Sequence, residues 1–512
     1  MSFNLSVVLR ESARQFPDRP AVIFDGGRLS YQELNEQSDR IAENLVRLGV
    51  EPGDVVGLQL ANVPEFPAAM YAILKAGAVL LPMSLLNKAP EVEFFLTDAR
   101  ARVVITSTES GSEGIRGGEL AGAEHIFVLG AAGEELAHEQ LDRPTRRFTD
   151  LLAEPEGSAE APYVQRDPGD TAVLLYTSGT TGRPKGVELT HFQLYMNARA
   201  HVEAFEMDEN SVTIAVMPLF HALGMSGILN ANFAVGGAVV LVKRFKADSV
   251  LEAIATNGAT VLHGVPTMYH TLLEYPQAKD YDLSTLRTCG SAGAPIAAEL
   301  MDSFEREFGV TILEMYGLTE SGPLATYNRP KDRKPYSIGK PLWGVDLELW
   351  GEDNRPLPPG RDNVGEIVLR GHCTMRGYLN NPQATEEAFA GGWLHTGDLA
   401  YCDEDGFYFI VDRKKEMIIR GGYNVYPREV EEVLYAHPAV NEVAVIGVPD
   451  ERLGEEVKAV VSLKKGQSAS EEELISYVKS RVAAYKYPRM VEIINDLPKG
   501  PTGKILKTEL KQ

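Results

Sequence analysis

Residues 173–186 read VLLYTSGTTGRPKG, a short apolar run followed directly by a loop rich in glycine, hydroxyl groups and positive charge. Glycines let the backbone approach oxygen atoms closely, hydroxyl and N–H groups donate hydrogen bonds, and Lys185 adds a compact positive charge. The spacing differs from that of a Walker A loop, because Pro184 and not glycine precedes Lys185. A flexible surface loop is the alternative interpretation, but the density of donors favours a loop that binds phosphate groups.

Outside this loop, helix-period and strand-period segments alternate as far as about Ile338. The expected strands are 55–60, 78–81, 103–106, 173–176, 212–216, 238–241 and 261–264, and the expected helices include 33–48 and 67–75. Alternation of this kind predicts parallel strands with helices packed on the faces of the sheet.

The pattern changes after Ile338. Runs at 345–349, 365–370 and 407–411 predict a small antiparallel or barrel-like subdomain, and a mixed helix and strand pattern returns from Arg428. The charged segment 412–415 lies between the two patterns and is predicted to be an uncoiled hinge near Lys415. The expected fold class is α/β. A large N-terminal domain (1–411) has doubly wound αβ layers plus the β-barrel-like subdomain, and a small mobile α+β domain (412–512) follows.

Composition restricts the classes of function. The chain has 512 residues, which exceeds what one hydrophobic core usually serves, and its net charge is -22. An acidic chain repels nucleic acid, so no nucleic-acid partner is expected. Three widely spaced cysteines give neither a zinc site nor a disulfide framework. No signal peptide is evident, and the most apolar stretch (68–86) contains Lys75 and Pro82, so a cytoplasmic protein without a membrane span is expected.

Seven further motifs follow the glycine-rich loop along the chain, at residues 217–221, 290–295, 316–320, 396–398, 412–413, 420–424 and 498–504. Together with the loop they resemble the motifs of the adenylate-forming superfamily, which includes acyl-CoA synthetases, nonribosomal adenylation domains and beetle luciferases. Segments 16–21 and 29–31 are also similar, so the resemblance covers nearly the whole chain. It points to the acyl-CoA synthetase branch, which acts on fatty and aryl acids.

The resemblance implies a reaction in which a carboxylate attacks the α-phosphorus of ATP and expels pyrophosphate. Positioning and electrostatic stabilisation would supply most of the catalysis. Tyr316 would offer a flat face to adenine, and Asp398, beside Arg413, would accept the ribose hydroxyls. The implied ATP-binding and AMP-binding residues are Thr177, Ser178, Gly179, Thr180, Thr181, Gly182, Lys185, Ser291, Ala292, Gly293, Met315, Tyr316, Gly317, Thr319, Asp398, Arg413 and Lys504.

The implied catalytic residues are Lys504, Thr319, Glu320 and His221. Glu320 would bind Mg²⁺, a hard cation that prefers oxygen ligands. Lys504 lies in a Gly/Pro/Thr loop near the chain end, where an unremarkable tail lysine is the alternative. In the family that lysine enters the active site and contacts the α-phosphate and the acyl carboxylate.

The family then transfers the acyl group to a thiol after a large rotation of its small domain. Lys415 matches the hinge of that rotation. The residues that match the binding surface for coenzyme A are Gly421, Gly422, Tyr423, Arg452 and Lys486, and a side chain at Gly422 would narrow the pantetheine tunnel.

The acid is expected to be hydrophobic. Adenylation domains for amino acids carry an aspartate where this chain has His221, so no partner for an ammonium group is evident. The predicted acyl pocket comprises His221, Gly224, Met225, Val265, Met268, Gly317 and Leu324, with Gly224 and Gly317 leaving room and the methionines adapting to shape. A medium-chain or long-chain fatty acid is favoured, and an aryl or other bulky acid comes second.

The sequence therefore predicts an ATP-dependent acyl-CoA synthetase that uses Mg²⁺, with ATP, CoA and a small carboxylic acid as its partners. A ligase that loads a carrier protein is an alternative. A non-catalytic nucleotide-binding relative is the alternative from another class, and retention of Lys504, Glu320 and Asp398 argues against it. A homodimer is compatible with the sequence.

Overall fold

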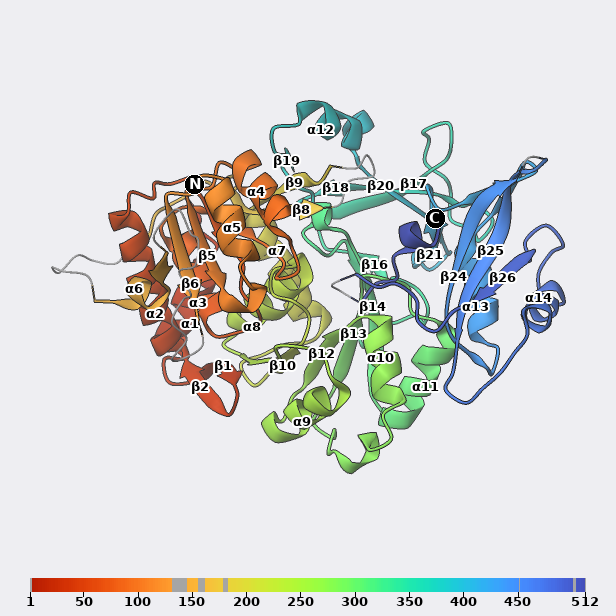
Figure 1. The fold of residues 1–512 in the computed structure, drawn as a ribbon, viewed down its shortest axis with the longest axis horizontal. Helices are drawn as coiled ribbons and strands as arrows, with labels where there is room; N and C mark the ends of the chain where they lie inside the picture. The colour runs from red at the N-terminus through yellow and green to blue at the C-terminus, as the bar shows by residue number, and fades with distance from the viewer. Residues whose placement is uncertain are drawn as a thin grey trace.

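The structure is a computed structural model that describes residues 2–130, 145–154, 162–177, 183–450, 452–500 and 503–511. Five residues of the predicted phosphate loop, Ser178, Gly179, Thr180, Thr181 and Gly182, lie outside the described residues. Figure 1 shows a large N-terminal part on one side and, on the other, a smaller part that contains α13, α14 and β24–β26.

One of two large sheets carries the strand ends that frame the site. In the described chain it has nine strands in the order β16-β15-β14-β13-β12-β10-β11-β1-β2. Strand β1 and strands β10–β14 run parallel, while β2, β15 and β16 are antiparallel to their neighbours. Gly264, Ser291 and Tyr316 therefore end three adjacent strands at the same edge, where open α/β sheets bind their ligands. The bounds are β1 (Pro20–Phe24), β2 (Gly27–Ser30), β10 (Val212–Ala215), β11 (Ala238–Leu241), β12 (Val261–Gly264), β13 (Thr288–Ser291), β14 (Thr311–Tyr316), β15 (Thr326–Tyr327) and β16 (Lys340–Pro341).

The second large sheet contains the two strands that flank the glycine-rich loop. Its eight described strands follow the order β19-β9-β8-β4-β3-β5-β6-β7. Strands β8 and β9 are antiparallel, and Thr177 lies opposite Lys185, so the two ends of the loop are side by side. The bounds are β3 (Val55–Leu58), β4 (Val79–Pro82), β5 (Val103–Ser107), β6 (His125–Leu129), β7 (Arg146–Arg147), β8 (Thr171–Thr177), β9 (Lys185–Thr190) and β19 (Gly377–Tyr378).

Helices cover these sheets. Helix α2 begins at a capping box, in which the Ser30 side chain accepts from the N–H of Glu33 and the Glu33 side chain accepts from the N–H of Ser30. The helix bounds are α1 (Val7–Gln15), α2 (Tyr31–Arg47), α3 (Glu65–Lys75), α4 (Ala89–Asp98), α5 (Glu113–Leu120), α6 (Thr149–Leu152), α7 (His191–Ala204), α8 (Ala231–Phe233), α9 (Ala247–Asn257), α10 (Pro266–Leu273), α11 (Ala298–Phe308) and α12 (Pro382–Ala388), with η2 (Leu223–Asn230) as a π-helix.

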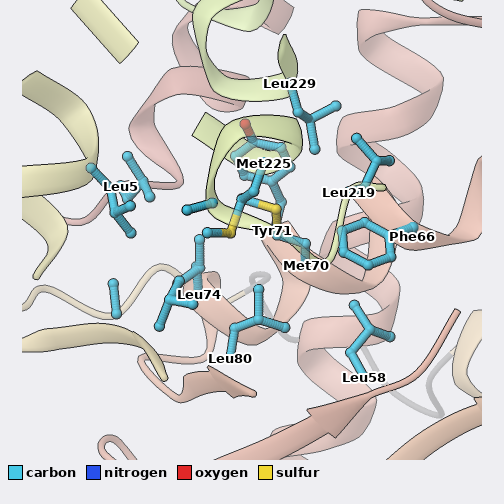
Figure 2. Packing of buried hydrophobic residues seen from close by; sticks show 14 of the residues in the cluster. Leu5, Leu58, Phe66, Met70, Tyr71, Leu74, Leu80, Leu219, Met225 and Leu229 are labelled. Atoms are coloured by element: carbon cyan, nitrogen blue, oxygen red, sulfur yellow. The ribbon is translucent and has the colours of Figure 1, made fainter. Parts of the chain in front are cut away.

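The largest hydrophobic cluster joins the two large sheets through α3 and η2. Figure 2 shows side chains of α3, among them Met70 and Tyr71, beside Met225 and Leu229 of η2. The hydroxyl of Tyr71 also donates to Oδ1 of Asn230 over 2.6 Å. Each such side chain contributes about 1.5–3 kcal/mol when fully buried, so this cluster fixes η2 against the sheets.

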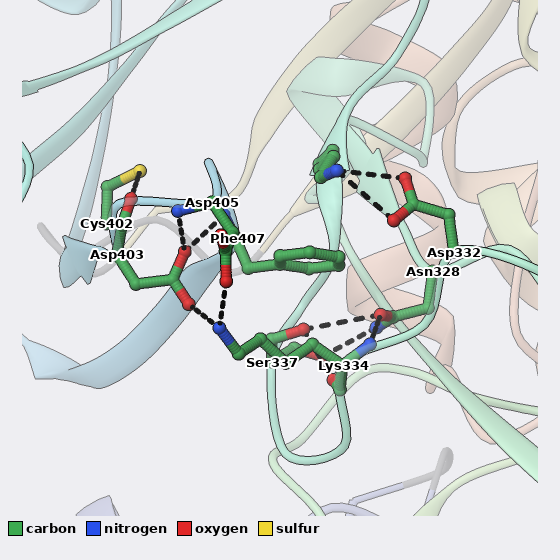
Figure 3. Close-up of polar contacts among 9 residues, drawn as sticks. Asn328, Asp332, Lys334, Ser337, Cys402, Asp403, Asp405 and Phe407 are labelled. Atoms are coloured by element: carbon green, nitrogen blue, oxygen red, sulfur yellow. Dashed lines mark hydrogen bonds and ion pairs between the residues drawn. The ribbon is translucent and has the colours of Figure 1, made fainter.

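A four-stranded antiparallel sheet follows, in the order β17-β18-β20-β21. Its bounds are β17 (Val345–Trp350), β18 (Gly365–Gly371), β20 (Leu394–Cys402) and β21 (Tyr408–Arg413). Figure 3 shows how the turn between β20 and β21 is held: the ammonium of Lys334 pairs with Asp403 and, at 2.8 Å, with Asp405. The hairpin places Asp398 directly opposite Arg413.

The C-terminal part has a hydrophobic cluster of its own. It contains α13 (Pro427–Tyr435), α14 (Glu471–Lys479), β22 (Ile418–Arg420), β23 (Tyr423–Val425), β24 (Val440–Asp450), β25 (Gly454–Leu463) and β26 (Met490–Ile493). In Figure 1 the dark-blue C-terminal tail leaves this part and extends toward the larger one.

The predicted fold class is confirmed, and most predicted strands and helices lie within a few residues of their observed bounds. The expectation of an uncoiled segment at 412–415 was wrong in part. Asp412 and Arg413 belong to β21, and Asp412 is buried and accepts from the N–H of Arg428 over 3.0 Å. Lys414 and Lys415 follow the strand and are exposed. Among the described helices, none has the length and apolar character needed to cross a membrane.

Asn62 joins the two large sheets, and its loss is expected to destabilise the N-terminal part. Its amide donates to the carbonyls of Ala215 (2.9 Å) and Met217 (3.0 Å), and its Oδ1 accepts from the N–H of Leu219 over 2.9 Å. We expect Asn62→Ala to lower the free energy of unfolding by about 2–3 kcal/mol, because buried backbone groups lose their partners. Urea unfolding measures the change. The exposed Asn210→Ala is the control, expected to stay within about 0.5 kcal/mol, and an equal effect of both changes would contradict the assignment.

Candidate active site

A cleft lies between the larger part and the C-terminal part, and both contribute to its walls. The residues of the larger part that line it include Val265, Thr267, Gly293, Met315, Tyr316, Gly317, Asp398 and Arg413. Those of the C-terminal part include Arg428, Glu431, Gly503, Lys504 and Lys507. The cleft thus brings together eight residues that the sequence assigned to the nucleotide or the acid, namely Val265, Gly293, Met315, Tyr316, Gly317, Asp398, Arg413 and Lys504.

Asp398 is the central acceptor of this cleft. It is 5% exposed, and its two carboxylate oxygens have different partners: Tyr316 donates its hydroxyl to Oδ2 over 2.7 Å, and Nε of Arg413 lies 3.0 Å from Oδ1. Burial, and then the charge of Asp398, raise the pKa of Tyr316 well above its usual value, so the phenol stays a donor. Each carboxylate oxygen can accept a second hydrogen bond, which leaves Asp398 able to accept hydroxyl groups from a ligand.

Lys504 reaches the cleft beside a contact that its neighbour Gly503 makes with α10. Oγ1 of Thr267 donates to the carbonyl of Gly503 over 3.3 Å. Gly503 has φ +79°, and a Cβ there would stand 3.0 Å from Oγ1 of Thr267, so glycine suits both the backbone and the close approach.

The ammonium of Lys504 has an altered proton affinity. Burial in the cleft lowers the pKa of Lys504 to about 8, and Arg413 adds to the effect while Glu416 and Asp398 oppose it. Lys504 nevertheless keeps contact with solvent, because part of its surface is exposed. An anion bound between Lys504 and Arg413 would favour the charged form of both.

Glu320 and Lys185 meet at Tyr378, which sequence analysis did not select. The hydroxyl of Tyr378 donates to Oε1 of Glu320 over 3.0 Å, and Nζ of Lys185 lies 4.8 Å from the centroid of the Tyr378 ring. Burial and the neighbouring Glu320 raise the pKa of Tyr378, so it remains a donor. A cation from the end of the glycine-rich loop is thereby held near the carboxylate of the 316–320 motif.

Backbone contacts fix the turn that carries Thr319 and Glu320. The N–H of Met375 donates to the carbonyl of Glu320 over 2.7 Å, and the side-chain amide Nδ2 of Asn197 donates to the carbonyl of Ser321 over 3.1 Å. Within the described residues no group of three or more His, Cys, Asp or Glu side chains could hold a metal. A metal at Glu320 would therefore take one carboxylate from the protein and its other ligands from phosphate and water, which is the usual manner of Mg²⁺.

The edge of the large sheet supplies the remaining nucleotide candidates. Ser291 ends β13 as a buried residue, and its hydroxyl has no hydrogen-bond partner among the described groups. Ala292 follows Ser291 along the chain, Gly293 lines the cleft, and Met315 precedes Tyr316 on β14.

Glu314 also lines the cleft and was missed from sequence. Burial raises its pKa to about 7, and its Oε2 has no partner among the described groups. A glutamate inside an apolar strand, one residue before the Met-Tyr pair, is the signal that could have identified it.

Of the predicted acyl-pocket residues, Val265 and Gly317 line the cleft, and the others lie in or just before η2, on α10 or before β15. Met225, Val265 and Leu324 are buried, and Met268 is half-buried. His221 precedes η2, and burial lowers its pKa to about 4, so its imidazole is neutral at pH 7. A neutral imidazole fits a wall beside an apolar acid better than a charged one does.

The expectation that Gly224 and Gly317 leave room for a ligand is not what the structure shows. A Cβ at Gly224 would stand 2.2 Å from the carbonyl oxygen of Pro218, and one at Gly317 would stand 1.8 Å from that of Pro323. The protein's own backbone occupies the space beside both glycines. Because these glycines have no side chain, the backbone can pack closely beside them. The sequence alone could not distinguish a glycine needed for such packing from one that leaves space for a ligand.

The predicted CoA-binding residues lie outside the lining of the cleft. Gly421 and Gly422 form an exposed turn between β22 and β23, and Tyr423, 60% exposed, stacks on Tyr485 at 4.8 Å. Arg452 is also exposed. Lys486 is not a free cation, because its Nζ pairs with Glu429 at 2.6 Å.

Comparisons with known proteins agree with this arrangement. Residues 9–379 match the family model for the AMP-binding enzyme, and residues 429–504 match the model for the AMP-binding enzyme C-terminal domain. A long-chain-fatty-acid–CoA ligase of Bacillus subtilis (strain 168) is 35% identical, over 99% of this chain and 94% of its own length. A feruloyl-CoA synthase of Amycolatopsis sp is 37% identical, over 98% and 97% of the two chains.

Solved structures give the same result. The crystal structure of the anthranilate CoA ligase AuaEII in complex with anthranoyl-AMP superimposes with a TM-score of 0.90 at 32% identity, covering 99% of this chain and 96% of that chain. With matches along almost the entire length, the chain belongs to the AMP-binding enzymes, in the acyl-CoA synthetase branch of the adenylate-forming superfamily.

Proposed function

We propose that this chain activates a hydrophobic carboxylic acid with ATP, releases pyrophosphate, and transfers the acyl group from acyl-AMP to coenzyme A. Its relatives are named as CoA ligases, which are acid–thiol ligases of the AMP-forming type. The observation that carries the proposal is the meeting of Tyr316, Asp398 and Arg413 with Lys504 from the tail in one cleft.

In this proposal the nucleotide lies along the edge of the large sheet. Tyr316 and residues 291–293 flank adenine, and Asp398 with Arg413 binds the ribose. The phosphates extend toward Lys185 and the glycine-rich loop, with Thr319 near the α-phosphate. Mg²⁺ bound at Glu320 would neutralise charge on the phosphates and on the leaving pyrophosphate.

Lys504 has the central electrostatic role in the first half-reaction. As the acid's carboxylate attacks the α-phosphorus, negative charge on the two reacting groups must be stabilised at short range. The ammonium of Lys504 can contact both groups, and a pKa of about 8 keeps it mostly protonated at pH 7. Proximity to the anionic nucleotide raises the charged fraction further.

A medium-chain or long-chain fatty acid is the favoured substrate, supported by the buried apolar side chains of Met225, Val265 and Leu324 and by the fatty-acid ligase among the relatives. An aryl acid is the second candidate, favoured by the relatives named for feruloyl and anthranilate substrates. Loading of a carrier protein in place of CoA is the alternative for the acceptor.

The second half-reaction is proposed to follow a rotation of the C-terminal part about Lys415, relative to the larger part that ends with β21. Support comes from the exposed turn at Gly421 and Gly422, which lies outside the cleft in the orientation that places Lys504 inside it. Rotation would bring this turn to the cleft, where a pantetheine arm could pass.

Pyrophosphate release across a panel of fatty, aryl and amino acids, with and without CoA, tests the proposed function. We expect release with apolar acids and not with amino acids, and acyl-CoA formation only when CoA is added. If no acid provokes release of pyrophosphate, the proposal is wrong. Release without acyl-CoA, but with acylation of a pantetheinyl carrier protein, would instead identify the alternative acceptor.

Lys504→Ala is expected to slow acid-dependent ATP–pyrophosphate exchange by about 10²–10³-fold, the loss typical when a preorganised charge donor is removed. Transfer from supplied acyl-AMP to CoA should stay near the wild-type rate, because Lys504 is assigned only to the first step. The control is Lys511→Ala, which removes an exposed lysine of the same tail. Normal exchange in the Lys504 variant would refute its assigned role.

Gly422→Leu is expected to show the opposite pattern, with transfer to CoA slowed by about tenfold or more through steric blockage, and exchange preserved. Because Gly422 has φ +85°, strain is a competing explanation. Gly466→Leu controls for it, since Gly466 has φ +80° and open space around it on the same part of the chain. If transfer to CoA slows equally in Gly422→Leu and Gly466→Leu, the assignment of Gly422 to the tunnel is wrong. The same holds if Gly422→Leu slows both half-reactions equally.

A further inference from the structure

Lys507 lies three residues after Lys504 and forms ion pairs with two carboxylates, those of Glu431 and Glu416. Its Nζ lies 2.8 Å from Oε1 of Glu431 on α13 and 3.4 Å from Oε2 of Glu416. The three side chains are 19%, 15% and 25% exposed, so they are held in place and only partly screened by water.

Glu416 lies within the electrostatic influence of two tail lysines, of which Lys507 forms an ion pair with it. Burial alone would raise its pKa, but Lys507, Arg413 and Lys504, in that order, bring the pKa below its usual value. Among the carboxylates that act on the Lys504 ammonium, Glu416 has a larger influence than Asp398. Within the described part of the chain, however, no carboxylate lies within ion-pair distance of Lys504, whereas Glu416 is already paired with Lys507.

We propose that Lys507 is a positioning residue that occupies Glu416 and so keeps the Lys504 ammonium available for the reacting carboxylate and phosphate. The inference rests on the role proposed above for Lys504. Lysine carries its charge on a flexible four-carbon stem, so Lys504 can turn toward an unpaired carboxylate. With Lys507 absent, Glu416 would lose its paired lysine in a partly buried place, and Lys504, whose charge already acts on Glu416, could replace it.

Lys507→Met tests the proposal, because it keeps the length and apolar stem of the side chain and removes its charge. We expect acid-dependent ATP–pyrophosphate exchange to fall by about fivefold to tenfold, the range of a partly buried charge pair. Transfer of the acyl group from supplied acyl-AMP to CoA should remain within about twofold of wild type, which also shows that the variant is folded. Lys507→Arg should behave like wild type.

The double variant Lys507→Met with Glu416→Gln distinguishes competition for charge from simple anchoring of the tail. If Lys504 pairs with Glu416 when Lys507 is absent, removing the charge of Glu416 should restore exchange to within about twofold of wild type. This is expected even though the tail has then lost the Lys507–Glu416 pair. Glu416→Gln alone should lower exchange less than Lys507→Met does, because it removes a charge that favours protonated Lys504 but leaves no unpaired carboxylate at that position. Lys499→Met is the matched control. Lys499 precedes Lys504 in the sequence, pairs with Glu442 at 2.7 Å and shares no carboxylate with Lys504.

Three results would overturn the inference: normal exchange in Lys507→Met, equal losses in both half-reactions, or loss of exchange that Glu416→Gln does not restore. Exchange by the wild-type protein is measured in the same series. Its absence with every acid would reject the proposed function itself, whereas normal wild-type exchange confines a failure to the role of Lys507.

Discussion

The hydrogen-bonded ion pair of Asp398 and Arg413, with Tyr316 as second donor, connects the parts of the structure on which the site depends. Tyr316 ends β14 of the large sheet, while Asp398 and Arg413 face each other across β20 and β21. A carboxylate that is 5% exposed needs such partners, because a buried charge without them is strongly destabilising. The same contacts therefore fix the sheet edge against the hairpin, and the hairpin leads directly into the C-terminal part.

Positive charge is concentrated around the site, although the chain as a whole is acidic. A chain with net charge -22 repels a polyanion at long range, yet the cleft holds Arg413 and Lys504, and Lys185 ends the glycine-rich loop. At contact distances these cations act on a bound polyanion more strongly than the many carboxylates outside the cleft, which water and salt screen. Burial, and then the nearby charge of Arg413, lower the pKa of Lys504, so an anion bound between the two cations would favour the charged form of Lys504.

Much of the fold and part of the site could be predicted from sequence. Apolar runs such as 261–264 and 238–241 coincide with β12 and β11, because β-branched residues bounded by turns specify short buried strands. Asp398, Arg413 and Tyr316 were predicted through their motifs, and the structure brings them into contact. Glu314 and Tyr378 were missed, because their importance comes from burial and from partners distant in the sequence. Gly224 and Gly317 were misread, since a glycine in a sequence does not reveal whether a ligand or the backbone occupies the space beside it.

The position of Lys504 on the tail gives the proposed reaction its two-step character. In the present orientation Gly503 docks on Thr267 and Lys504 lines the cleft, while the turn at Gly421 and Gly422 is exposed elsewhere. Lys504 and the turn at Gly421 and Gly422 both belong to the C-terminal part, so a single orientation of that part cannot bring both of them to the cleft. A lysine needed only while pyrophosphate leaves can then withdraw with its domain, and the same movement would deliver the glycine turn for thiol transfer. The contact between Thr267 and Gly503 is a single hydrogen bond, which is weak enough to form and break in each cycle.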